Sequence, residues 1–317
     1  MVTGRWRWLA AVLWLTATAT AAKLEMQQQR EGELLRYHYS WQDPQRKAQQ
    51  LSFAVPADGE QGVRYRSYRP EMASAEVRQA LLKTAASFQG IELVSVGAPS
   101  EGRFQLRGGS DEERQAAQAE LDKVSSAIRQ QFLSGHQQAE IRLPNGEHGV
   151  IPDHLYYINA SLPAFATMAG ELRQRFKGPD PRPLIEYLLP WVQSLPYVAM
   201  ANRFANPTLE FRPPLAVLQQ HGGDCDSKAT LLATILRAVH PDLPLAMVYL
   251  PEHAMLAIQL PHASGERYVN LQGRRMLLVD VAGPAMLPIG SIGERSGTLI
   301  SAGSYALREV PMGKGGD

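Results

Sequence analysis

The sequence predicts an α+β protein in which a helix carrying the only cysteine packs on an antiparallel sheet, preceded by a small α+β domain. Two patterns predict this plan. Apolar residues recur at helical spacing from residue 225 to residue 239. After Pro241, short segments rich in Val, Ile, Leu and Met alternate with turn residues, which is typical of strands joined by hairpins. A chain of 317 residues is long enough to bury the cores of two such units.

The first half of the chain predicts the small N-terminal domain, which we place at residues 23–135. Residues 23–33 are polar and Gln-rich and are interpreted as a leader. Segments rich in β-forming residues on either side of Asp43-Pro44 predict a hairpin. The predicted elements of this domain are strands at 35–41, 51–55, 91–96 and 103–106 and helices at 74–88 and 111–133.

The second half predicts a connecting region followed by a catalytic domain. The Pro-rich run at 178–183 marks the junction. We therefore assign residues 136–180 to connecting strands and a helix, 181–305 to the catalytic domain and 306–317 to a frayed tail. The predicted elements are strands at 140–143, 150–157, 245–250, 254–260, 267–271 and 275–281 and helices at 162–176, 184–195, 213–220 and 225–239.

The first residues predict a secretory signal peptide. Arg5 and Arg7 precede an apolar run at 9–15 and small residues at 16–22. Removal of residues 1–22 is expected to give a secreted or periplasmic protein with no stable membrane insertion, and an uncleaved anchor is the alternative. The charge is balanced, with 32 Lys and Arg against 31 Asp and Glu, so no bulk attraction to nucleic acid is expected.

Cys225 is the candidate nucleophile. Asp224 is suited to cap the following helix, which puts Cys225 in its first turn. Unpaired N–H groups and the helix dipole favour a thiolate there. A lone thiol in an oxidising compartment has no internal partner for a disulfide, so it is inert and buried or kept for chemistry, with pairing to another molecule as the third option. Its position in a polar turn, and not on the apolar helix face, favours chemistry.

Residues 223–229, Gly-Asp-Cys-Asp-Ser-Lys-Ala, resemble the Gly-Asp-Cys-x-x-Lys-Ala signature of the transglutaminase-like superfamily of papain-fold cysteine enzymes. The likeness continues through Glu-His-Ala at 252–254 and Leu-Val-Asp at 278–280, and it covers residues 181–290. It implies a papain-like core and acyl transfer through a Cys225 thioester. A peptidase or amidase acting on a protein or peptide substrate is expected. An amine-accepting transglutaminase and a catalytically silent binding module are the alternatives.

A thiol nucleophile needs a base, and the resemblance implies His253, which follows a turn at the mouth of a strand. Asp280, at the end of an apolar strand, is expected to orient that histidine, and a plain turn residue is the alternative. Three other histidines are rivals of His253 because they lie within or near the same domain: His221, His240 and His262.

An oxyanion hole is expected to use the backbone N–H of Cys225. The resemblance implies a second donor from the stretch 191–197, for which Gln193 is our choice and Trp191 its rival. Gln219 lies at the distance from the cysteine that papain uses, a different arrangement, and has little weight.

Asp224 and Asp226 flank the candidate nucleophile. A negative charge beside a thiol opposes its ionisation, so these carboxylates are expected to cap the helix, point away or meet a cation. Some secreted bacterial relatives bind calcium at such residues, but the ion takes about 6–8 oxygen ligands, so calcium is the weaker alternative. No other cofactor is expected.

Two further expectations concern the surroundings of the site. Residues 197–214 are expected to form an open loop that admits water, and no aromatic cluster surrounds His253, so hydrolysis should exceed amine transfer. The remaining histidines have neither ligand spacing nor clustered carboxylates and are expected to be solvated or core residues: His38, His136, His148 and His154.

Overall fold

The computed structural model describes residues 24–58, 63–96, 103–146, 148–198 and 211–313. Within these ranges the chain folds into helices and four antiparallel sheets, so the predicted α+β class is confirmed at this level. The predicted signal peptide and residues 199–210 of the predicted open loop lie outside the described ranges. Among the residues described, no helix combines the length and apolar character that crossing a membrane requires.

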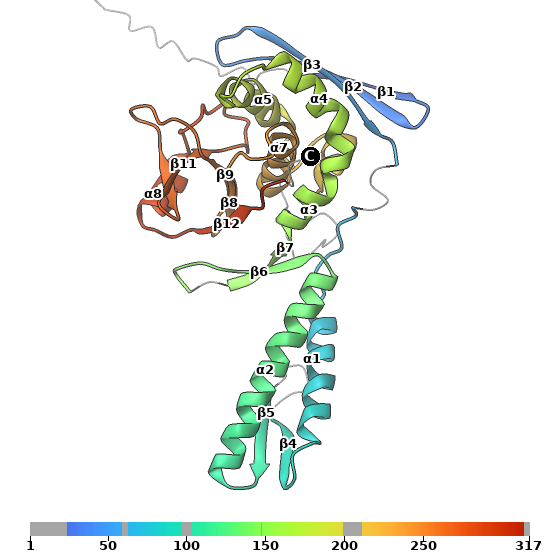
Figure 1. Cartoon of the computed structure of the whole chain (residues 1–317), viewed down its shortest axis with the longest axis vertical. Helices are drawn as coiled ribbons and strands as arrows, with labels where there is room; N and C mark the ends of the chain where they lie inside the picture. The colour runs from blue at the N-terminus through green and yellow to red at the C-terminus, as the bar shows by residue number, and fades with distance from the viewer. Residues whose placement is uncertain (1–23, 59–62, 97–102, 147, 199–210, 314–317) are drawn as a thin grey trace, which may run out of the picture.

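A five-stranded sheet of order β10-β11-β9-β8-β12 organises the second half of the chain (Figure 1). Its strands are β8 (Leu245–Leu250), β9 (His253–Ile258), β10 (Tyr268–Leu271), β11 (Arg274–Val279) and β12 (Ala306–Val310). The four strands predicted between 245 and 281 are confirmed. The prediction of a frayed tail at 306–317 is wrong for β12, which pairs with β8 and buries Val310. In the sequence, the polar residues Arg308 and Glu309 interrupt the apolar pattern that would have predicted this strand.

Both faces of this sheet are covered by helices. Residues of β8 alternate between two core clusters, so Met247 faces the larger core while Val248 faces the smaller one. The larger core includes α7 (Cys225–Val239), and the smaller one includes residues of α8 (Glu294–Ser301), a helix that the sequence did not reveal. Burial on both faces explains why these strands read as continuous apolar runs.

Helix α7 lies among the other helices and the five-stranded sheet in the upper part of Figure 1. The sequence predicts a helix with one buried face, but every residue of α7 except Ala238 is buried. The helices around it are α3 (His154–Ser161), the 3₁₀ turn η3 (Leu162–Phe165), α4 (Ala166–Arg175), α5 (Arg182–Ser194) and α6 (Pro214–Gln219). Its buried hydroxyls Thr230 and Thr234 donate to carbonyl oxygens one turn back, at 2.7 and 2.8 Å. The two threonine hydroxyls of α7 are therefore satisfied within the helix.

The first sheet belongs to this same core. It comprises β1 (Glu25–Glu31), β2 (Leu34–Gln42) and β3 (Ala48–Pro56). Tyr39 and Phe53 pack edge-on against Trp191 of α5, with ring centroids 5.3 and 6.0 Å apart. The predicted N-terminal domain at 23–135 is thus divided, because its first sheet packs on the second half of the chain. The predicted polar leader contains β1.

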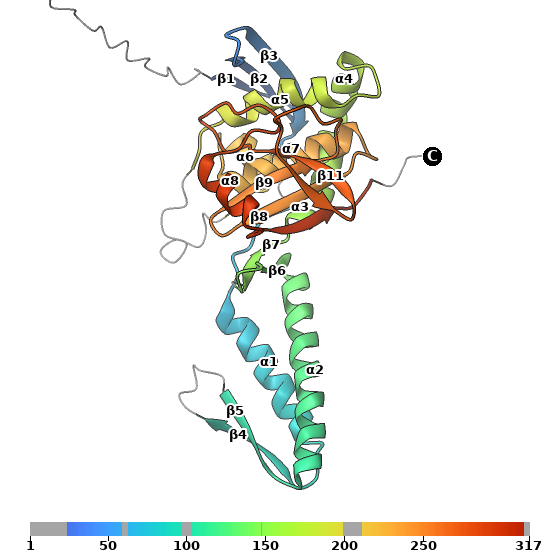
Figure 2. The same ribbon diagram turned by 90° about the vertical axis from the view of Figure 1, so that its left-hand side faces the viewer.

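The rest of the predicted N-terminal domain projects from the body as an arm (Figures 1 and 2). The arm consists of α1 (Pro70–Ala85), β4 (Ile91–Val96), β5 (Arg103–Gly108) and α2 (Asp111–Gly135). The hairpin of β6 (Gln138–Arg142) and β7 (His148–Pro152) lies at its base. The strand predicted at 150–157 is wrong beyond Pro152, because the β-forming residues Tyr156, Tyr157 and Ile158 lie in α3.

Candidate active site

Cys225 lies at the start of α7, buried to 7% exposure. The Asp224 carboxylate caps the helix by accepting from the Ser227 backbone N–H at 3.1 Å, as predicted. The preceding turn needs glycine, because Gly222 has φ 151° and a Cβ there would lie 2.5 Å from the Pro196 carbonyl oxygen. The absence of a side chain at Gly222 therefore lets Pro196, in the segment after α5, lie directly against the turn that precedes Cys225.

His253 and Asp280 meet beside the thiol. His253 opens β9, Asp280 follows β11, and these two strands are neighbours in the sheet. The His253 Nε2 atom lies 3.1 Å from Asp280 Oδ1, which also accepts from the Ala282 backbone N–H at 3.1 Å. The Cys225 thiol lies close enough to the same imidazole to raise its pKa. The structure therefore brings the three sequence-predicted catalytic residues together.

The electrostatics of His253 favour the imidazolium. Burial lowers the pKa of His253, but the hydrogen bonds and charges of Asp280 and Cys225 outweigh burial and raise it to about 10. With Nε2 turned to the carboxylate, Nδ1 remains for the thiol. This geometry suits an ion pair of thiolate and imidazolium.

Tyr197 is the site residue that sequence reasoning missed. It lies on an exposed extended segment that forms a parallel bridge with Gly223, and its phenol lies close enough to Cys225 for the two groups to interact electrostatically. Burial of the phenol and the charges of Cys225 and Asp224 raise the pKa of Tyr197 to about 12, so the hydroxyl keeps its proton. The sequence places the second oxyanion donor in the stretch 191–197, which ends at Tyr197. Only the bridge to Gly223 shows that this last residue lies beside the thiol.

The assignment of Gln193 as oxyanion donor is corrected by its hydrogen bonds. Its Nε2 donates to the carbonyl oxygens of Asp280 and Leu287, at 2.7 and 2.9 Å, which occupies both N–H groups. The rival Trp191 lies fully buried in the core, with its ring against Tyr39. Gln219 donates to the Ala57 carbonyl oxygen. Gln193 instead joins α5 to the segment that carries the aspartate.

The two carboxylates beside the thiol are compensated by neighbours. Asp226 accepts from the Ser227 backbone N–H at 2.9 Å and lies 3.1 Å from Nε2 of His154. Burial and the adjacent charge of Asp226 raise the pKa of Asp224 to about 8, so it carries a proton at neutral pH. His154, interpreted from sequence as solvated or core, is a buried partner of Asp226 and of the Tyr249 hydroxyl, at 2.9 Å. Nothing in its spacing to Asp226 revealed this pairing.

The calcium alternative has no cluster to support it, since no group of three or more His, Cys, Asp or Glu residues suited to a metal occurs in the described ranges. The rival histidines lie elsewhere. His221 adopts φ 55° in the turn before Gly222, His240 ends α7, and His262 Nε2 lies 3.0 Å from the Glu266 carbonyl oxygen. None of the three contacts the thiol in the described structure.

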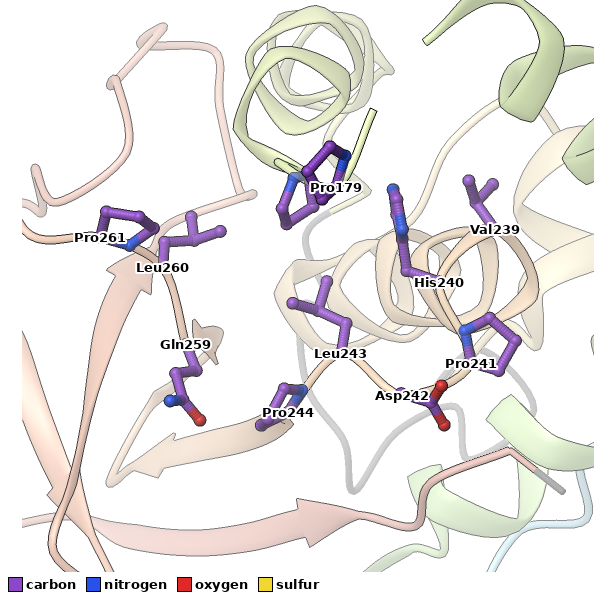
Figure 3. A pocket seen from close by; sticks show the side chains of 11 residues that line it. Pro179, Val239, His240, Pro241, Asp242, Leu243, Pro244, Gln259, Leu260 and Pro261 are labelled. Carbon is purple, nitrogen blue, oxygen red and sulfur yellow. The ribbon is translucent and has the colours of Figure 1, made fainter. Parts of the chain in front are cut away.

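A cavity of about 680 Å³ lies at the opposite end of α7 from Cys225 (Figure 3). Five prolines contribute to its lining, together with His240, Asp242 and Gln259. A helix of 15 residues separates it from the thiol by about 20 Å. This cavity is therefore distinct from the candidate active site.

Comparisons with protein-family models, with curated proteins and with solved structures found no match to this chain. The geometry of the site and the residues around it are therefore what bear on function.

Proposed function

We propose that this protein is a transglutaminase-like cysteine enzyme with a papain-like core, acting as a peptidase or amidase. The observation that carries the proposal is the meeting of Cys225, His253 and Asp280, from a helix start and two strand ends, around one buried thiol. A helix that carries the nucleophile and packs on the sheet that carries the base further supports it. The motif at 223–229 supports it from the sequence.

The proposed reaction begins with attack of the Cys225 thiolate on an amide carbonyl carbon. The carbonyl oxygen becomes an oxyanion, which the Cys225 backbone N–H and the Tyr197 hydroxyl stabilise by hydrogen bonds. The imidazolium of His253 gives its proton to the leaving amine, and a thioester remains. His253, now neutral, takes a proton from water, which attacks the thioester, releases the carboxylic acid and restores the thiolate and imidazolium. Asp280 keeps the imidazole in one tautomer throughout.

Water is the proposed acceptor, although an amine would follow the same path. The neighbours of His253 include Glu252, which is exposed and pairs with Arg295, and Ala254, which is buried in the sheet. Neither provides an aromatic wall that would exclude water from the thioester. The proposed setting is the periplasm or the exterior, which rests on the predicted signal peptide at 1–22.

A catalytically silent binding module is the second candidate, and the low exposure of Cys225 favours it. Incubation with a mixture of Gln-containing and extended peptides, with and without excess primary amine, followed by mass analysis of the products, separates the candidates. The expected result is hydrolysis that Cys225→Ala abolishes. Amine incorporation exceeding hydrolysis would assign a transglutaminase, while peptide binding without turnover would assign a silent module.

A further inference from the structure

Lys228 is a charged residue with no access to water. It lies one turn after Cys225 on the same face of α7 and is 0% exposed. Long cationic side chains are rarely buried completely unless a partner compensates the charge. Its complete burial beside a candidate nucleophile therefore calls for an explanation that solubility or packing does not provide.

The ammonium of Lys228 joins segments that meet at the site. Its Nζ donates to the Ala282 carbonyl oxygen at 2.7 Å and lies 3.5 Å from the Gln193 carbonyl oxygen. Ala282 follows the catalytic aspartate by two residues, and Gln193 precedes Tyr197 in the chain by four. The bonds of Lys228 thus fix α7 to the segments that carry the aspartate and the phenol.

The contact between those two segments is close enough to exclude any side chain. A Cβ on Gly283 would lie 2.0 Å from the Gln193 carbonyl oxygen, so the backbone of α5 touches the loop after β11. The Gln193 side chain bonds the same loop through the Asp280 and Leu287 carbonyl oxygens. Lys228 of α7 contacts both sides of this junction, through the Gln193 and Ala282 carbonyl oxygens.

The surroundings of Lys228 are negative or electron-rich. Its ammonium lies 5.9 Å from the centre of the Tyr197 ring. Burial lowers the pKa of Lys228 to about 8, while the charges of Asp280 and Cys225, and that of Asp224 once it ionises, act in the opposite direction. At neutral pH the group is therefore mostly a cation in a medium where charges interact more strongly than in water.

We propose that Lys228 is a positioning residue for the thiol chemistry: its buried ammonium stabilises the Cys225 thiolate and ties the nucleophile helix to the two segments beside it. The inference rests on the proposed function, because the proposed role of the ammonium is to stabilise the thiolate that acts as the nucleophile. Lys228 does not touch substrate.

The test measures the rate of iodoacetamide alkylation of Cys225 against pH, by intact mass, in the full chain and two variants. Lys228→Gln keeps an N–H donor for the Ala282 carbonyl but removes the charge, and Lys228→Met removes both. In both variants the midpoint of the pH profile should rise by about one unit or more. An unchanged midpoint in folded Lys228→Gln would overturn the proposal, because a purely structural role needs only the donor.

Arg237 provides a matched control on the same helix. It is 2% exposed, and its guanidinium donates to the carbonyl oxygens of Pro241 and Val310. It lies nine residues after Lys228, about 14 Å along the helix. Arg237→Gln should lower the melting temperature and leave the alkylation midpoint unchanged. A midpoint shift equal to that of Lys228→Gln would show that lost helix stability, and not local charge, causes the effect, and would overturn the proposal.

A second measurement covers the case in which the Lys228 variants do not fold. Carbon-13 NMR of lysine Cε follows the titration of Lys228 in the wild-type chain and in Cys225→Ala. Since coupling between two charges is reciprocal, loss of the thiolate should lower the titration midpoint of Lys228. Equal midpoints in the two proteins would contradict the proposal. The proposed function is judged separately, by peptide products that depend on Cys225.

Discussion

At the scale of single residues, the candidate site depends on hydrogen bonds that sequence patterns do not encode. The sequence predicts Cys225, His253 and Asp280 because a motif and strand ends mark them. It does not predict Tyr197, which reaches the thiol through a single backbone bridge. It also predicts Gln193 as an oxyanion donor, whereas the side-chain amide of Gln193 donates to the Asp280 carbonyl oxygen within the protein. Polar side chains near a motif are thus ambiguous until their own partners are known.

Tyr197→Phe tests the oxyanion role at this scale. The variant keeps the ring beside Lys228 and loses only the hydroxyl, so kcat/KM for peptide hydrolysis should fall by about 100-fold while binding of substrate changes little. Steady-state kinetics with a cleaved peptide measure this. Alkylation of Cys225 should persist in the variant. Hydrolysis at the wild-type rate would mean that the hydroxyl only covers the thiol in the free enzyme.

At the scale of elements, α7 combines a helix cap with a buried carboxyl pair. The pKa of Asp224 is raised to about 8 by burial and by Asp226, above its unfolded value. From about pH 4 to pH 8 the unfolded chain ionises this group while the folded chain does not, so the free energy of the unfolded state falls and stability decreases as pH rises. The cap of the nucleophile helix therefore costs stability at neutral and mildly alkaline pH.

Asp224→Asn should remove that cost. Asparagine caps helices as well as aspartate and cannot ionise. We expect the melting temperature of the variant to exceed that of the wild type at pH 8 and to match it near pH 3, measured by calorimetry. A lower melting temperature at pH 8 would show that the ionised aspartate stabilises the helix and that its proton is not retained.

The elements themselves could be predicted where local pattern and environment agree. The strands at 245–281 and helix α7 are predicted correctly, because each is an apolar run or a helical apolar pattern bounded by turn residues. The sequence does not reveal β12 and α8, because polar residues interrupt their apolar patterns and the residues that they pack against lie far away in the sequence. In α3, packing against α7 overrides the β preference of Tyr156 and Tyr157.

At the scale of the whole molecule, the domain boundaries follow packing and not sequence order. The first sheet joins the core around α7 through Trp191, so the body is assembled from segments far apart in the chain. The arm begins and ends at one place, since Nε2 of Gln138 donates to the Arg66 carbonyl oxygen at 2.6 Å. No local pattern could reveal these contacts, because they join residues far apart in the chain.

Excision of residues 67–137, with a short Gly-Ser linker, should therefore leave a folded body. The linker spans a gap that the native chain closes by a direct hydrogen bond, so the entropic cost of closure is small. Circular dichroism and native mass spectrometry check the fold, and alkylation of Cys225 should match that of the full chain. An unfolded product would show that the arm, and not only the shared core, stabilises α3 and α7.

The central claim is that Cys225 is an activated nucleophile, and alkylation of the native protein tests it most directly. Iodoacetamide at pH 6 should modify Cys225 faster than it modifies glutathione, because His253 and the start of α7 favour the thiolate. His253→Ala should slow the reaction, and intact mass spectrometry follows both. Modification that occurs only after denaturation would identify Cys225 as a buried structural thiol and contradict the account.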